Sequence, residues 1–130
     1  MLLKKRVSDA KVVLILSGYY PQVRLLQSRI NQVARDIHIL KIECSTIDQA
    51  QGREADIVVL SLTRSNRNSK VGFLRELERV NVAVSRAREL LYIVGDDRFI
   101  LRADNAESLQ KVLGHIRKTS DDCSFVELKK

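Results

Sequence analysis

The sequence is poor in cysteine and histidine, and this excludes a fold held together by zinc. Its 130 residues contain two cysteines, Cys44 and Cys123, and two histidines. The cysteines lie too far apart for a zinc knuckle, and neither has a histidine close enough to complete a set of ligands. We therefore predict two free thiols, no metal site and a reducing compartment.

Long apolar runs are also missing, which excludes a membrane-spanning helix. No run approaches the ~20 apolar residues that such a helix needs. The first residues, Met1 to Arg6, have neither the apolar core nor the cleavage site of a signal peptide. We expect a soluble intracellular protein, cytoplasmic or nuclear, with no membrane partner.

The motifs of a self-sufficient hydrolase are absent as well. None of the five glycines is followed by Lys-Ser or Lys-Thr, so the chain has no Walker A loop to cradle phosphates. It has no Gly-x-Ser-x-Gly elbow, and we interpret His38 and His115 as surface groups rather than catalytic bases. Asp96, which closes an apolar run, is interpreted as a strand-terminal residue. A nucleotide hydrolase that acts alone is therefore excluded.

What the chain does have is positive charge and enough apolar residues for one core. The net charge is +7, and 45% of the residues are hydrophobic and 30% charged. This composition is typical of a globular domain, and the charge favours a polyanionic partner such as nucleic acid or nucleotide. We assign residues 11–118 to one domain, between a basic N-terminal segment, 1–10, and a tail, 119–130. The chain is expected to be a piece of a longer protein.

The hydrophobic pattern alternates between strands and helices. Short β-branched runs bounded by polar residues predict buried strands at 11–17, 37–44, 57–62 and 90–95. Apolar residues at helical spacing predict helices that begin at Pro21, span 73–88, and begin at Asp104 or Asn105. In the 73–88 helix, Arg79 and Arg86 would lie on one side. The alternation predicts an α/β fold with a mostly parallel sheet and helices on both faces.

Polar segments at the ends of these strands mark the expected functional site. Ligands of parallel sheets bind outside the carboxyl ends of the strands. The polar segment 46–54 precedes the 57–62 strand, so we expect the strand that ends near Cys44 to bring it to the same rim. The basic stretch 63–72 is expected to be a long surface loop.

Three segments resemble motifs of superfamily 1 helicases and occur in the same order. Residues 46–56, Thr-Ile-Asp-Gln-Ala-Gln-Gly-Arg-Glu-Ala-Asp, resemble motif V. Residues 79–88, Arg-Val-Asn-Val-Ala-Val-Ser-Arg-Ala-Arg, resemble motif VI, and residues 18–22, Gly-Tyr-Tyr-Pro-Gln, are similar to motif IV. Together they resemble the subgroup that contains the RNA-decay helicase Upf and senataxin.

The resemblance implies the second RecA-like motor domain of an ATP-driven translocase. ATP and Mg²⁺ would be held mainly by the first RecA-like domain, which is absent from this sequence. Arg86 matches the family's arginine finger, which stabilises the transferring phosphate, and Arg88 points either to the same cleft or to solvent. Glu54 matches a carboxylate near the nucleotide sugar. Tyr19 would stack on the base or pack over the sheet end. The implied ATP-binding residues are Tyr19, Gln22, Gly52 and Glu54.

The resemblance also implies contacts to single-stranded DNA or RNA, through Thr46, Gln51 and Arg64. A hydroxyl and an amide grip phosphates without reading sequence, as does the exposed backbone of Gly52. The alternative for Thr46 and Gln51 is local capping of the loop, and for Arg64 it is simple solvation. The chain is thus expected to be the C-terminal motor domain of an ATP-dependent helicase, inactive alone. The alternative is a non-catalytic module, derived from a motor domain, that binds nucleic acid or protein.

Overall fold

The computed structural model describes residues 11–33, 40–62, 77–102, 107–118, 123–124 and 126–127. The predicted contact Arg64, the segment 1–10 and the side chain of Arg79 lie outside this description. The described chain divides into two compact units. The first comprises 11–33, 40–62 and 81–95, and the second comprises the remaining described residues.

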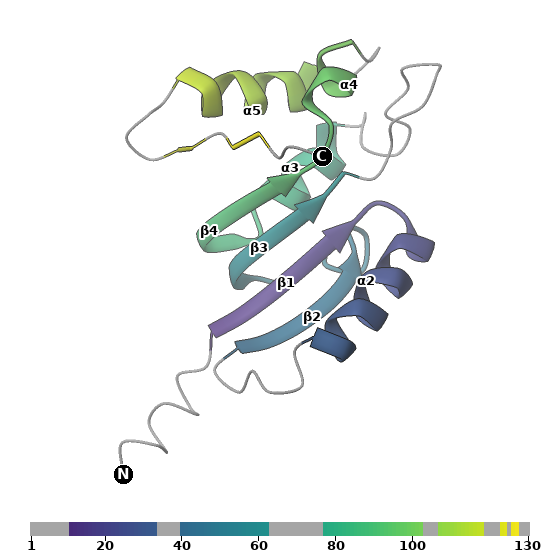
Figure 1. The fold of residues 1–130 in the computed structure, drawn as a ribbon. Helices are drawn as coiled ribbons and strands as arrows, with labels where there is room; N and C mark the ends of the chain where they lie inside the picture. The colour runs from purple at the N-terminus through teal and green to yellow at the C-terminus, as the bar shows by residue number, and fades with distance from the viewer. Residues whose placement is uncertain are drawn as a thin grey trace. The chain divides into compact units, whose positions relative to one another are not determined.

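A four-stranded parallel sheet forms the centre of the first unit (Figure 1). Its strands are β1 (Lys11–Ser17), β2 (Leu40–Thr46), β3 (Ala55–Ser61) and β4 (Ala87–Val94), in the order β2-β1-β3-β4. All three pairings are parallel, and Val13 of β1 lies opposite Ile42 on one side and Ile57 on the other. The predicted α/β fold with a parallel sheet is confirmed.

The two inner strands carry the core because their side chains are apolar on both faces. Leu14 and Leu16 of β1, and Val58 and Leu60 of β3, share one face and are each at most 1% exposed, and Val13 on the other face of β1 is 8% exposed. The polar side chains of these two strands, such as Ser17 and Asp56, lie at or next to the strand ends, so the chemistry of the sheet is expected at its two edges.

Helix α2 (Tyr20–Val33) follows β1 and packs against β1 and β2 (Figure 1). Pro21 lies in its first turn, where a missing backbone N–H costs no hydrogen bond. Val23 is buried, and its backbone N–H donates to the carbonyl of Tyr19 at 3.2 Å. Arg24 and Arg29 are exposed.

Helix α3 (Leu77–Val84) ends earlier than the sequence predicted. Ser85 and Arg86 form a turn, and β4 begins at Ala87, so the prediction that Arg86 stands on a helix face is wrong. Pairing with the sheet ends the helix here, because the backbone N–H of Ala55 donates to the carbonyl of Arg86 at 3.0 Å. Tertiary hydrogen bonding overrides the helical preference of the Arg-Ala-Arg stretch.

The second unit contains two further helices, α4 (Asp97–Arg102) and α5 (Glu107–Lys118). The sequence predicted α5 but not the short α4, and the predicted cap at Asp104 or Asn105 lies outside the described residues. Arg117 Nη2 and Asp97 Oδ2 form an ion pair at 2.5 Å that joins the two helices. No helix in the described ranges is long and apolar enough to cross a membrane.

Candidate functional site

The segment between β2 and β3 connects the two opposite edges of the sheet. It leaves the carboxyl end of β2 after Thr46 and enters the amino end of β3 at Ala55 (Figure 1). The expectation that 46–54 stays at the carboxyl rim is therefore wrong for its second half. The geometry is dictated by the topology, because β2 and β3 are parallel and the chain must return to the start of the sheet.

One group of predicted site residues lies at the carboxyl edge. Tyr19 and Gln22 follow β1, and Thr46 ends β2 directly opposite Ser17, the last residue of β1. Two hydrogen bonds hold this edge together: the backbone N–H of Ile47 donates to the carbonyl of Ser17 at 3.0 Å, and the N–H of Tyr19 donates to Ser17 Oγ at 3.3 Å.

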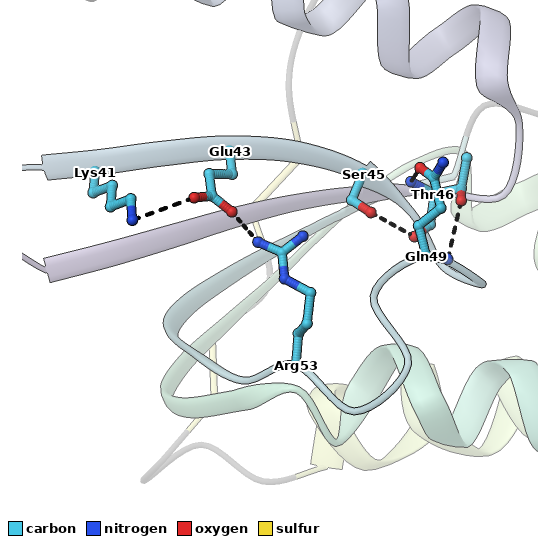
Figure 2. A network of polar contacts seen from close by, with 6 residues as sticks. All are labelled: Lys41, Glu43, Ser45, Thr46, Gln49 and Arg53. Carbon is cyan, nitrogen blue, oxygen red and sulfur yellow. Dashed lines mark hydrogen bonds and ion pairs between the residues drawn. The ribbon is translucent and has the colours of Figure 1, made fainter.

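Thr46 and Gln49 form a reciprocal capping box (Figure 2). The backbone N–H of Gln49 donates to Thr46 Oγ1 at 3.2 Å, and the backbone N–H of Thr46 donates to Gln49 Oε1 at 3.4 Å. This pattern starts a helical turn by satisfying two backbone donors. The local capping that the sequence left open for Thr46 is thus present, and it uses the hydroxyl oxygen as an acceptor.

A single helical turn follows, and glycine ends it. The backbone N–H of Ala50 donates to the carbonyl of Thr46 at 3.1 Å. Ile47 and Ala50 are buried, whereas Gln51 and Gly52 are exposed. Gly52 has a φ of +82°, a left-handed conformation that disfavours any residue with a Cβ.

Arg53 anchors the segment to the face of the sheet (Figure 2). Its Nη2 forms an ion pair with Glu43 Oε2 on β2, and Glu43 Oε1 also lies 3.5 Å from Lys41 Nζ. The side chain of Arg53 is thus paired with a carboxylate of β2 in this structure.

The second group of predicted site residues lies at the amino edge and centres on Arg86. Three hydrogen bonds hold its guanidinium: Nε donates to the carbonyl of Val82 at 3.1 Å, Nη1 to the carbonyl of Arg53 at 3.1 Å, and Nη2 to Ser85 Oγ at 3.1 Å. Each terminal nitrogen carries a second N–H. Arg86 is thus oriented by its neighbours and keeps donors that can bind an anion.

Glu54 and Arg88 lie at the same edge and form an ion pair with each other. Arg88 Nε lies 3.5 Å from Glu54 Oε2, and both side chains are exposed. The structure therefore brings together Gly52, Glu54, Arg86 and Arg88, and separates them from Tyr19, Gln22 and Thr46.

Metal and thiol chemistry are not suggested by the described side chains. Among them, no group of three or more His, Cys, Asp and Glu residues could hold a metal ion. Cys44 and Cys123 are free, and burial raises the pKa of the Cys44 thiol, which disfavours the reactive thiolate form.

The family is shown by comparison of the sequence with models of known protein families. Residues 1–98 match an AAA domain. The chain belongs to this family, the C-terminal AAA domain of Upf-like superfamily 1 helicases. The predicted resemblance to Upf-like superfamily 1 helicases is therefore confirmed.

Curated relatives agree with this family. The DNA polymerase alpha-associated DNA helicase A of Saccharomyces cerevisiae is 42% identical over 91 residues, which are 70% of this chain and 13% of the relative. The ATP-dependent helicase NAM7 of the same yeast is 41% identical over 68 residues, 52% of this chain and 7% of the relative. The NFX1-type zinc finger-containing protein 1 homolog of Caenorhabditis elegans is 32% identical over 126 residues, 92% of this chain and 5% of the relative. The chain thus spans a small part of the length of these relatives.

Several residues that shape the site were not predicted from the sequence. For the capping partner Gln49 a signal was present, because Thr-x-x-Gln is a known start signal for a helical turn. Ser85 and the carbonyl of Arg53 had no such signal, because their contacts to Arg86 depend on where α3 ends and how β3 pairs with β4.

Proposed function

We propose that this domain is the second RecA-like motor half of an ATP-dependent superfamily 1 helicase, and that it hydrolyses no ATP alone. The observation that supports the proposal is the guanidinium of Arg86, held by three hydrogen bonds at the amino edge of the sheet. A group that must act at the moment of bond breaking is most effective when its orientation is fixed beforehand.

Arg86 acts in this proposal as an arginine finger. When water attacks the γ-phosphorus of ATP, the bond to the bridging oxygen breaks and negative charge spreads over the phosphoryl and leaving oxygens. The second N–H groups on Nη1 and Nη2 donate to these oxygens from across the cleft. Because the charge develops in the transition state, the interaction lowers the barrier more than it strengthens the binding of ATP.

The nucleotide contacts the amino edge of the sheet in this proposal. Glu54 lies on the same edge as Arg86, and its carboxylate accepts hydrogen bonds from ribose hydroxyls once Arg88 releases it. ATP supplies the phosphoryl group, and the first motor domain holds Mg²⁺ and the β- and γ-phosphates. The donors and acceptors at the amino edge fit the remaining contacts to ATP. Arg86 would bind phosphate, Glu54 would bind ribose, and the backbone of Gly52 is exposed beside them.

The nucleic-acid strand contacts the carboxyl edge. A strand of seven residues is about 20 Å long, so the two edges of the sheet present two well-separated sets of polar groups. We therefore propose that Tyr19, Gln22 and Thr46 face the single strand, with Tyr19 stacking on a base. This differs from the expectation that Tyr19 and Gln22 bind ATP. The exposed side chain of Gln51 remains a candidate for a phosphate contact.

Recombination with a first motor domain tests the function. The 130-residue chain should show no ATPase activity above background, and activity stimulated by single-stranded nucleic acid should appear when the first motor domain of the same protein is supplied. Chain that carries Arg86→Ala should fail to restore it. A chain that binds single strands but never restores activity would instead be a non-catalytic binding module.

A further inference from the structure

The hydroxyl group of Ser85 lies between the end of α3 and the guanidinium of Arg86. Its oxygen is 3.2 Å from the carbonyl oxygen of Val82 and 3.1 Å from Nη2 of Arg86. An arginine side chain has donors and no acceptor, so Ser85 accepts from Arg86 and gives its own hydrogen to Val82. The direction of both hydrogen bonds is therefore fixed.

The end of α3 makes this arrangement possible. In a longer helix the carbonyl of Val82 would accept the backbone N–H of Arg86, but α3 ends at Val84 and this carbonyl has no partner in the helix. The side chains of Ser85 and Arg86 both donate to it instead, Arg86 through Nε at 3.1 Å. A closed ring results, which runs from Val82 O through Ser85 Oγ and Arg86 Nη2 to Nε and back.

The ring fixes the plane of the guanidinium. Contacts at Nε and Nη2 restrict rotation about the bonds that carry the group, and the contact from Nη1 to the carbonyl of Arg53 holds its other end. Loss of the Ser85 hydroxyl would break the ring and leave the other two contacts in place. The guanidinium would then keep its general position and lose part of its orientation.

We infer that Ser85 is a positioning residue, whose hydroxyl sets the orientation in which Arg86 meets the transferring phosphate. The catalytic consequence rests on the proposed function. The contact itself belongs to the chain and is measurable without any activity. A small error in the placement of a catalytic group lowers the rate steeply, so the expected effect lies between that of a neutral change and that of removing Arg86.

Kinetics of the complete helicase that carries this domain provide the first test. Ser85→Ala should lower kcat about tenfold and leave the KM for ATP within about twofold, because the hydroxyl acts on the transition state through Arg86. Ser85→Thr, which retains a hydroxyl group, should restore most of the rate. Ser85→Ala should have no further effect when Arg86→Ala is already present. Ser28→Ala, which removes an exposed serine hydroxyl from α2, is the matched control.

NMR of the isolated 130-residue chain provides the second test. Rotation about the Nε–Cζ bond of Arg86 should be slow in the natural chain, severalfold faster in Ser85→Ala, and slow again in Ser85→Thr. Unchanged rotation in Ser85→Ala would overturn the inference, and so would a normal kcat in Ser85→Ala when Arg86→Ala is inactive. Normal turnover in Arg86→Ala would instead overturn the proposed function, and the rotation rates would still decide whether Ser85 orients Arg86.

Discussion

Arg88 and Glu54 face each other across the amino ends of β4 and β3, with Arg88 Nε 3.5 Å from Glu54 Oε2. The two side chains are 56% and 61% exposed. In this arrangement the guanidinium of Arg88 and the carboxylate of Glu54 form an ion pair with each other instead of binding a ligand. The ion pair also distinguishes the surroundings of the two arginines, because Arg88 faces a carboxylate whereas Arg86 is held by two backbone carbonyls and a hydroxyl.

The Arg88–Glu54 ion pair should contribute little to stability. Water screens a pair with this exposure, so a double-mutant cycle with Arg88→Ala and Glu54→Ala should give a coupling energy below about 1 kcal/mol. Urea unfolding of the chain measures this value. A coupling energy well above that limit would show that the pair is a structural element of the sheet edge.

Removal of the Arg86 side chain should nearly abolish catalysis by the complete helicase. Arg86→Ala should lower kcat by about 10³-fold or more, with a much smaller effect on the binding of ATP. Arg86→Lys should restore little, because an ammonium group cannot reproduce the planar fork of a guanidinium. Steady-state ATPase assays and circular dichroism of the same preparations make the measurement. Arg29→Ala, which removes an exposed arginine from α2, should leave kcat unchanged. A folded Arg86→Ala protein with near-normal turnover would exclude Arg86 as the finger.

Two glycines should respond to alanine in opposite directions. Gly52 has a φ of +82°, and a Cβ placed on it would meet no atom within 4 Å. Gly52→Ala is therefore strained by its backbone alone and should destabilise the chain by about 1 kcal/mol. Gly114 lies inside α5 with equally open space around it, and Gly114→Ala should stabilise by about 0.5 to 1 kcal/mol. Chemical denaturation of both variants tests this contrast. Equal effects of the two changes would contradict the assigned conformation of Gly52.

Thr46 should have a structural role that can be separated from nucleic-acid binding. Thr46→Ala removes the acceptor for the N–H of Gln49 and should lower the free energy of unfolding by about 1 kcal/mol, whereas Thr46→Ser should retain most of it. The affinity for a fluorescent single-stranded oligonucleotide, measured under conditions where both variants are folded, reports whether Thr46 also contacts nucleic acid. If Thr46→Ala binds as tightly as the natural chain, its hydroxyl serves only the capping box.

The sequence predicted the strands of the sheet better than it predicted the local structure around Arg86. β1 was predicted with its observed bounds, because an uninterrupted apolar run closed by a polar residue identifies a central strand. The turn at Ser85 and Arg86 was missed because the stretch from Arg86 to Arg88 consists of good helix formers, and pairing between β3 and β4 ends the helix there. For the same reason, the sequence could name Arg86 and could not identify the groups that orient it.

The connection between Thr46 and Ala55 is about as long as the distance that it has to span. Its helical turn advances about 1.5 Å per residue and its extended part about 3.4 Å, which gives a reach of roughly 23 Å. The path must return along a strand about 20 Å long and also cross β1, a sideways step of about 10 Å, so its ends lie roughly 22 Å apart. Thr46 and Ala55 are both held by pairing within the sheet, so the connection fits this span only with the single helical turn that the structure shows. Removal of one residue from it would require that turn to unwind.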